Sequence, residues 1–82
     1  MSEQTLRDQL VAFGLSEKEV DAYLVVLQSG QATTSEVARV ADISQGYVYE
    51  IAGELVDRGL ISLDESATPT RLRARPPEEA LG

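Results

Sequence analysis

The chain begins with apolar residues at helical spacing. Leu6, Leu10 and Phe13 lie at i, i+4 and i+7, which predicts an amphipathic helix over residues 5–13. Gly14 follows directly and marks the expected end of that helix.

A second helix is predicted over residues 17–29. Ser16 and Glu19 are spaced as a capping box, in which each side chain bonds a backbone N–H of the other residue, and Gly30 stands where a C-terminal cap is expected. The pattern divides the apolar residues of this helix into a buried face and two valines outside it. The expected buried residues are Val20, Tyr23, Leu24 and Leu27, and Val25 and Val26 are expected at or near the surface.

Two more helices are predicted with a short connection between them. Thr33 and Glu36 repeat the capping-box spacing before a helix over residues 34–41, and Ser44 is the expected N-cap of a helix over residues 45–58. Helices joined this closely form a helix-turn-helix unit. The inward or half-inward residues are expected to be Val37, Ala38 and Val40 in the first helix and Val48, Ile51, Ala52 and Leu55 in the second.

After Gly59 the spacing of apolar residues changes to the alternation of strands. Residues 60–63 and 70–75 predict two strands with a turn between them, which together make a hairpin. Alternation places Leu72 and Ala74 on one face of the second strand. The opposite face carries the guanidinium groups of Arg71, Arg73 and Arg75.

This order of elements is that of a winged helix-turn-helix domain. The expected fold is mainly α with a small β-hairpin, made of three to four helices plus a two-stranded wing. The 82 residues are too few for two hydrophobic cores, so residues 1–82 are expected to form one domain. Its expected parts are the helix-turn-helix at about 34–58, the wing at about 60–75 and a C-terminal turn at 77–81.

The composition excludes most catalytic chemistry. The sequence contains no cysteine and no histidine, so disulfides, thiolate chemistry and most zinc sites are excluded, and no cofactor, metal site or enzyme activity is expected. No apolar run is long enough to span a membrane, and the N-terminus lacks the pattern of a signal peptide. These features predict a cytoplasmic protein.

The charge is strongly acidic. Fourteen Asp and Glu face seven Lys and Arg, which gives a net charge of -7. Taken alone, this charge argues against nucleic acid, because phosphate backbones select basic surfaces. The acidic, lysine-poor composition also resembles that of proteins from organisms with molar salt in their cytoplasm. At about 1 M ionic strength the screening length is only about 3 Å, so in such a halophilic protein the charge says less about partners.

Short motifs in the sequence narrow the prediction from the winged-helix fold to one family. The stretch FGLSEKEVDAYLVVLQSGQATTSEVARVADISQGYVYEIAGELVDRGLI, followed by RLRARPPEEAL, resembles the DNA-binding domain of TrmB-type archaeal transcriptional regulators. The resemblance covers residues 13–81 and implies a DNA-binding regulator of transcription. The chain is then either a small regulator or the N-terminal domain of a longer one. The motifs that carry it are Gly14-Leu15-Ser16, Glu19, Tyr23, Gly30, Ser35-Glu36-Val37-Ala38, Ile43-Ser44, Val48-Tyr49-Glu50, Leu55 and Arg58-Gly59-Leu60.

With double-stranded DNA as the expected partner, the 45–58 helix is expected in the major groove. Recognition helices read bases mainly with residues near their N-terminus. Gln45 has the amide for adenine edges, Tyr49 the ring for a phosphate or a thymine methyl, and Glu50 the acceptor for cytosine. Each of these also has a purely structural or solvated interpretation. The candidate base-facing residues are Gln45, Gly46, Tyr47, Tyr49, Glu50 and Gly53.

A second group of residues is expected on the DNA backbone. The three wing arginines form the basic cluster, and the start of the 34–41 helix offers hydroxyls and backbone amides to a phosphate. The alternatives are that the arginines pair with Asp64 and Glu65 and that Thr33 serves only as a cap. The candidate backbone contacts are Thr33, Ser35, Arg39, Ser44, Arg71, Arg73 and Arg75.

One rival function remains open. Winged helices also serve as protein-interaction modules of the transcription machinery, and the absence of positive charge at Gln45-Gly46-Tyr47 favours that role. An apolar patch around Val11, Val25 and Val26 would be its surface. A homodimer is possible in either case, through the first helix or the C-terminal turn.

Overall fold

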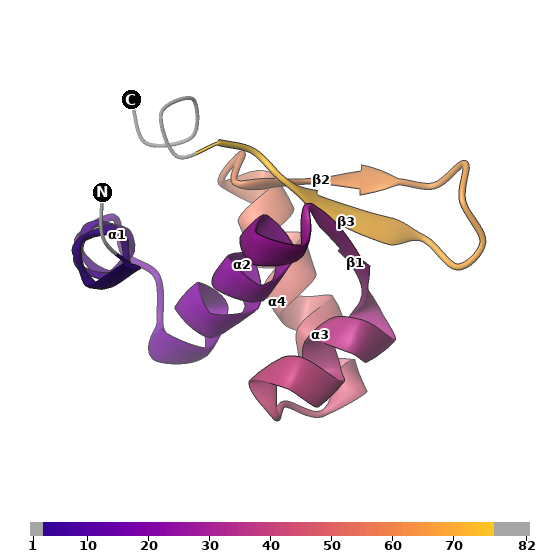
Figure 1. Ribbon diagram of the computed structural model, residues 1–82, viewed down its shortest axis with the longest axis horizontal. Coiled ribbons are helices and arrows are strands. Elements are labelled where there is room, and N and C mark those ends of the chain that lie inside the picture. The colour runs from indigo at the N-terminus through magenta and orange to yellow at the C-terminus, as the bar shows by residue number, and fades with distance from the viewer. Residues whose placement is uncertain (1–2, 77–82) are drawn as a thin grey trace.

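The computed structural model describes residues 3–76, and the expected C-terminal turn at 77–81 lies outside this range. Figure 1 shows a group of helices with a small sheet along one side. In chain order the elements are α1 (Glu3–Ala12), α2 (Glu17–Ser29), β1 (Gln31–Thr33), α3 (Thr34–Ala41), α4 (Gln45–Asp57), β2 (Ile61–Asp64) and β3 (Arg71–Ala74).

The predicted caps fix the starts of the helices. The Ser16 hydroxyl accepts the Glu19 N–H at 3.3 Å, and the Glu19 carboxylate accepts the Ser16 N–H at 2.8 Å. The same reciprocal pair forms between Thr33 and Glu36, and Ser44 caps α4. These local hydrogen bonds satisfy backbone donors that a helix start leaves free, which is why the predicted starts of α2, α3 and α4 are confirmed.

The sheet has three strands, not the two of the predicted hairpin. Its antiparallel order is β1-β3-β2, so β3 lies in the middle. Strand β1 pairs Gln31 with Arg73 and Thr33 with Arg71. The prediction missed this strand because three residues are too few to show a period, and their partners lie about forty positions away.

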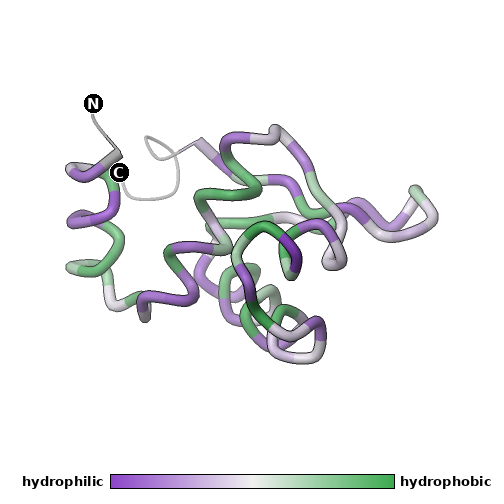
Figure 2. Tube along the Cα trace, turned by 60° about the horizontal axis from the view of Figure 1, so that its bottom comes forward, coloured by the Kyte–Doolittle hydropathy of each residue, from purple (hydrophilic) through white to green (hydrophobic). Residues whose placement is uncertain are grey.

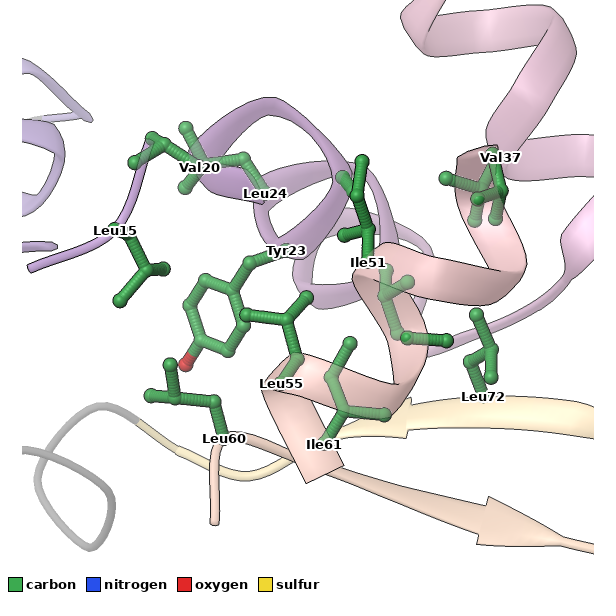
Figure 3. Packing of buried hydrophobic residues seen from close by; sticks show 14 of the residues in the cluster. Leu15, Val20, Tyr23, Leu24, Val37, Ile51, Leu55, Leu60, Ile61 and Leu72 are labelled. Carbon is green, nitrogen blue, oxygen red and sulfur yellow. The ribbon is translucent and has the colours of Figure 1, made fainter. Parts of the chain in front are cut away.

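The core forms where α2, α4 and the inner face of the sheet meet. Tyr23 is the largest side chain that is completely enclosed. Figure 3 shows its ring among Leu15, Leu55 and Leu60. Hydrophobic residues recur among hydrophilic ones along each helix (Figure 2). At helical spacing this pattern gives each helix an apolar stripe, which faces the core.

Two predictions about α2 were wrong. Val26, expected near the surface, is 0% exposed, and Val25 is half-buried. Leu27, expected in the buried face, is only half-buried. The reason is that α2 lies in the middle of the fold and contacts α1, α3, α4 and the sheet, so it buries more than one stripe (Figure 1).

Two other apolar residues are more exposed than predicted. Val40 was expected inward or half inward but is 64% exposed, because α3 is a surface helix that fixes itself to the core mainly through Val37. Phe13 lies just beyond the end of α1 and is also exposed. Helix α1 is held against α2 by buried Leu6 and Leu10 and by the ion pair between Arg7 and Asp21 at 2.9 Å.

Within residues 3–76, no helix is both long enough and apolar enough to cross a membrane. This finding agrees with the absence of a long apolar run in the sequence.

Candidate nucleic-acid interface

Helix α4 is anchored by one face and exposed on the other. The predicted anchors Val48, Ile51, Ala52 and Leu55 are all buried. The opposite face is in solvent, with Tyr49 62% exposed. The structure therefore brings all the candidate base-facing residues to one accessible surface: Gln45, Gly46, Tyr47, Tyr49, Glu50 and Gly53 are exposed.

Gln45 connects the two helices of the helix-turn-helix. Its side-chain Nε2 donates to the Ser35 hydroxyl at 3.0 Å and to the Thr34 hydroxyl at 3.3 Å. A bidentate contact with adenine needs an amide N–H together with the amide oxygen. Reading adenine would therefore require Gln45 to exchange at least one of these bonds, and in the free protein it joins the start of α4 to the start of α3.

Two of the candidate backbone contacts are engaged as caps. Thr33 is buried, and its hydroxyl and N–H both bond to Glu36. The Ser44 hydroxyl accepts the Tyr47 N–H at 3.2 Å but is exposed. Ser35 and Arg39 are also exposed on α3. The geometry thus supports the capping interpretation for Thr33, while the other three side chains are accessible to a phosphate.

The arginines divide into engaged and available groups. Arg73 pairs with Asp64 at 3.2 Å, and Arg58 donates to the carbonyls of Phe13 and Gly14. Among residues 3–76, no ion pair or side-chain hydrogen bond engages the remaining three candidates. These are Arg39 on α3, Arg71 on β3 and Arg75 after β3.

Two carboxylates lie beside the available arginines and stay ionised. Hydrogen bonds from the Thr33 N–H and hydroxyl lower the pKa of Glu36, and the charges of Arg71 and Arg39 lower it further. Bonds from Ser66 lower the pKa of Asp64, with smaller contributions from Arg73 and Arg71. A phosphate at the wing therefore competes with these two negative charges for the arginines.

The rest of the α4 surface is acidic. Glu50, Glu54 and Asp57 are exposed, and α4 contains no Lys or Arg. With Glu19 at the start of α2, these residues line an open groove between the two helices. Negative charge there repels phosphate at low salt, so favourable electrostatics must come from the wing and from α3.

The two glycines of the exposed face have no packing role in the free chain. A Cβ added at Gly46 or at Gly53 meets no atom within 4 Å. A glycine inside a helix costs about 1 kcal/mol relative to alanine. Their presence is consistent with close approach of the α4 backbone to a partner.

Gly53→Ala is therefore expected to act in opposite directions on stability and on binding. The free energy of unfolding should rise by up to about 1 kcal/mol, because alanine restricts the unfolded chain and meets open space in the folded one. DNA affinity should fall if the α4 backbone lies close to the groove. Urea denaturation and a DNA titration measure the two effects. A loss of stability would contradict the open space, and unchanged affinity would contradict the close approach.

Sequence reasoning missed one exposed residue at this surface. Leu63 on β2 lies two residues after Ile61, on the same face of the strand, and was assigned to the strand pattern alone, yet it is 43% exposed. It lines a hollow of about 330 Å³ between α4 and the wing, together with Tyr49 and Gly53. The only signal in the sequence was its position at the outer end of the strand.

The fold is shared with proteins of known structure. TrmBL2, an archaeal chromatin protein whose structure shows a novel mode of DNA binding, is 24% identical, with a TM-score of 0.84 over 99% of this chain and 31% of that chain. A MarR family protein from Bacillus stearothermophilus is 17% identical, with a TM-score of 0.74 over 95% of this chain and 56% of that one. The chain thus spans less than two thirds of either protein, and these likenesses show the winged-helix fold.

The sequence family is more specific than the fold. None of the curated proteins compared with the chain matches it. The profile of the family described as sugar-specific transcriptional regulator TrmB matches residues 10–78, which confirms the resemblance seen in the motifs. The chain belongs to the TrmB family of transcriptional regulators.

Proposed function

We propose that the chain binds DNA sequence-specifically, with α4 in the major groove and the wing and α3 on the sugar-phosphate backbone. The observation that carries this proposal is the pairing state of the arginines. Arg39 and Arg75 are exposed, Arg71 is half-buried, and none of the three forms an ion pair among residues 3–76, although the chain carries an excess of carboxylates. An unpaired arginine in an acidic protein is well suited to an external anion such as phosphate.

The exposed face of α4 supplies the groups for reading bases. Tyr47 and Tyr49 flank that face, and Glu50 offers an acceptor for the amino group of cytosine. Gly46 and Gly53 have no side chain, so they leave open space above the α4 backbone on this face. In this proposal Gln45 first positions α4 against α3 and reaches a base only by exchanging its bonds to Ser35 and Thr34.

The backbone contacts are not equivalent. Arg71 and Arg39 have no ion pair to break, although Glu36 attracts both, whereas Arg73 must give up Asp64 at 3.2 Å. The exposed hydroxyls of Ser35 and Ser44 add neutral donors at the starts of α3 and α4. Arg75 lies beyond β3, where its backbone carbonyl is fixed by the Tyr23 hydroxyl.

Arg71→Ala is expected to weaken DNA binding and to reduce its salt dependence. Each phosphate contact contributes about 0.9 to the slope of log affinity against log salt, so losing one contact should make the slope shallower by about that amount. Arg73→Ala should change the slope less, because its ion pair with Asp64 already offsets its charge. Fluorescence anisotropy of a labelled random-sequence duplex, from about 0.05 M to about 1 M salt, measures both.

Lys18→Ala is the matched control, since it removes one exposed positive charge at the start of α2. An equal change of slope in this variant would show that net charge, and not the wing, governs binding. The wing assignment also fails if Arg71→Ala keeps the slope of the unmodified protein.

A second candidate is supported by the acidic surface of α4. Glu50, Glu54 and Asp57 present negative charge where a DNA reader usually presents positive charge, which suits a basic protein partner of the transcription machinery. Absence of binding to any duplex over the whole salt range would favour this function. Binding as a homodimer to palindromic sites stays a prediction for either candidate.

A further inference from the structure

The hollow between α4 and the wing is lined mostly by apolar residues. We call it the helix-wing hollow, and its volume is about 330 Å³. Its apolar lining is Tyr49, Ala52 and Gly53 from α4, Leu63 from β2, Leu72 from β3 and Pro69 from the turn between the strands. The other lining residues are Thr34, Thr70 and Glu65.

Two large apolar side chains that line this hollow remain exposed to solvent. Leu63 pairs directly with Leu72 in the sheet, so the two share one face, yet Leu72 is 2% exposed and Leu63 is 43% exposed. The inner face of the hairpin thus continues past the part that the helices cover. Tyr49 on the other wall is more exposed still. Both side chains line the same cavity from different elements, so one group entering it would contact both.

The charges around the hollow select against an anion. None of its lining residues is Lys or Arg, and Glu65 adds a negative charge to the lining. Arg71 lies between two lining residues of the chain, Thr70 and Leu72, but strand alternation directs it to the opposite face of the sheet. A phosphate is therefore favoured outside the hollow, and a neutral, largely apolar group is favoured inside it.

Under the proposed function, the position of the hollow identifies that group. With α4 in a major groove and the wing on the adjoining backbone, the element between them is the sugar-phosphate strand that separates two grooves. The neutral and largely apolar part of this strand is its deoxyribose. We propose that the helix-wing hollow receives a deoxyribose of bound DNA, with Leu63 and Tyr49 packed on the sugar and the flanking phosphates outside the hollow.

This inference rests on the proposed function, but an experiment can test the two independently. An apolar contact releases no counterion, so removing it should lower affinity at every salt concentration without changing the salt slope. Leu63→Ala removes three carbon atoms of a side chain that is already more than half buried in the free protein. It is therefore expected to weaken binding of the labelled random-sequence duplex roughly tenfold, with a slope equal to that of the unmodified protein.

Val11→Ala is the control, because Val11 is also an exposed apolar residue but lies on α1, away from the wing (Figure 1). Its affinity should be unchanged. Circular dichroism must show that Leu63→Ala remains folded, which its exposure predicts. Equal affinity of Leu63→Ala and the unmodified protein, with Arg71→Ala still altering the slope, would overturn the sugar contact and leave the proposed function standing. Failure of the unmodified protein to bind DNA would overturn both.

A second measurement reports on the sugar directly. Hydroxyl radicals cleave DNA by attack on deoxyribose, so a duplex selected from a random pool should show protected sugars under the protein. Leu63→Ala, at a concentration that saturates the duplex, should restore cleavage at sugars next to the major groove that α4 occupies and leave the other protection intact. An unchanged cleavage pattern would show that the hollow does not contact the DNA. The hollow would then be assigned to an apolar side chain of a protein partner.

Discussion

Replacement of Leu55 by alanine is expected to lower the free energy of unfolding by about 2–5 kcal/mol. Leu55 is 0% exposed at the centre of the anchored face of α4, and Figure 3 shows it between Tyr23 and Ile61. Alanine leaves a cavity because α2 and the sheet enclose the site from both sides. A domain of 82 residues is stable by about 4–12 kcal/mol, so this one change removes a large part of the total.

Urea denaturation followed by far-ultraviolet circular dichroism measures this loss. Urea is preferred to guanidinium chloride because the latter is a salt and would screen the net charge of -7 during the titration. Leu63→Ala is the matched control, since it makes the same change at an exposed leucine and should cost about 0.5 kcal/mol or little more. Similar losses in the two variants would refute the packing described for α4.

The second large effect is expected at Tyr23. Tyr23→Ala should lower the free energy of unfolding by about 3–5 kcal/mol, the range for buried aromatic residues. The ring is 0% exposed, and its hydroxyl donates to the Arg75 carbonyl at 2.6 Å. The Arg75 N–H in turn donates to the Leu60 carbonyl at 2.9 Å. Tyr23 therefore both fills the core and holds the chain where it leaves the wing.

Tyr23→Phe separates these two contributions. It keeps the ring and removes the hydroxyl, so its cost should be about 0.5–1.5 kcal/mol, the net value of one hydrogen bond. Hydrogen exchange of the Arg75 amide should accelerate in this variant, because its backbone is no longer held by α2. If Tyr23→Phe cost as much as Tyr23→Ala, the hydroxyl and not the packed ring would dominate, contrary to the burial observed.

The proposed DNA reader is held at both of its ends. The start of α4 is joined to α3 through Gln45, and Arg58 after its last turn donates to the carbonyls of Phe13 and Gly14. Between the ends, its buried face packs against α2 and the sheet. A helix fixed in this way presents its exposed face in one orientation, which base recognition requires.

The starts of α2, α3 and α4 and the buried face of α4 were determined by the sequence itself. Ser16, Thr33 and Ser44 cap their helices through hydrogen bonds that span three residues, so the neighbours of each cap are sufficient to form them. The i, i+3, i+4 and i+7 spacing in α4 likewise predicted its anchors correctly. The TrmB motifs were visible for the same reason, because most of them are caps and core positions of these helices.

Only the tertiary structure decided the features that depend on distant partners. Strand β1 exists because β3 offers it a free edge, and Val26 is buried because several elements surround α2. Val40 is exposed because no residue in the described part of the chain covers α3 there. The predicted alternation of the wing arginines was correct, but the sequence did not show which of them forms an ion pair. The register sets Asp64 directly opposite Arg71, yet the Asp64 carboxylate forms its ion pair with Arg73, which is opposite Ser62. Which arginine is paired depends on distances in space that spacing along the chain does not specify.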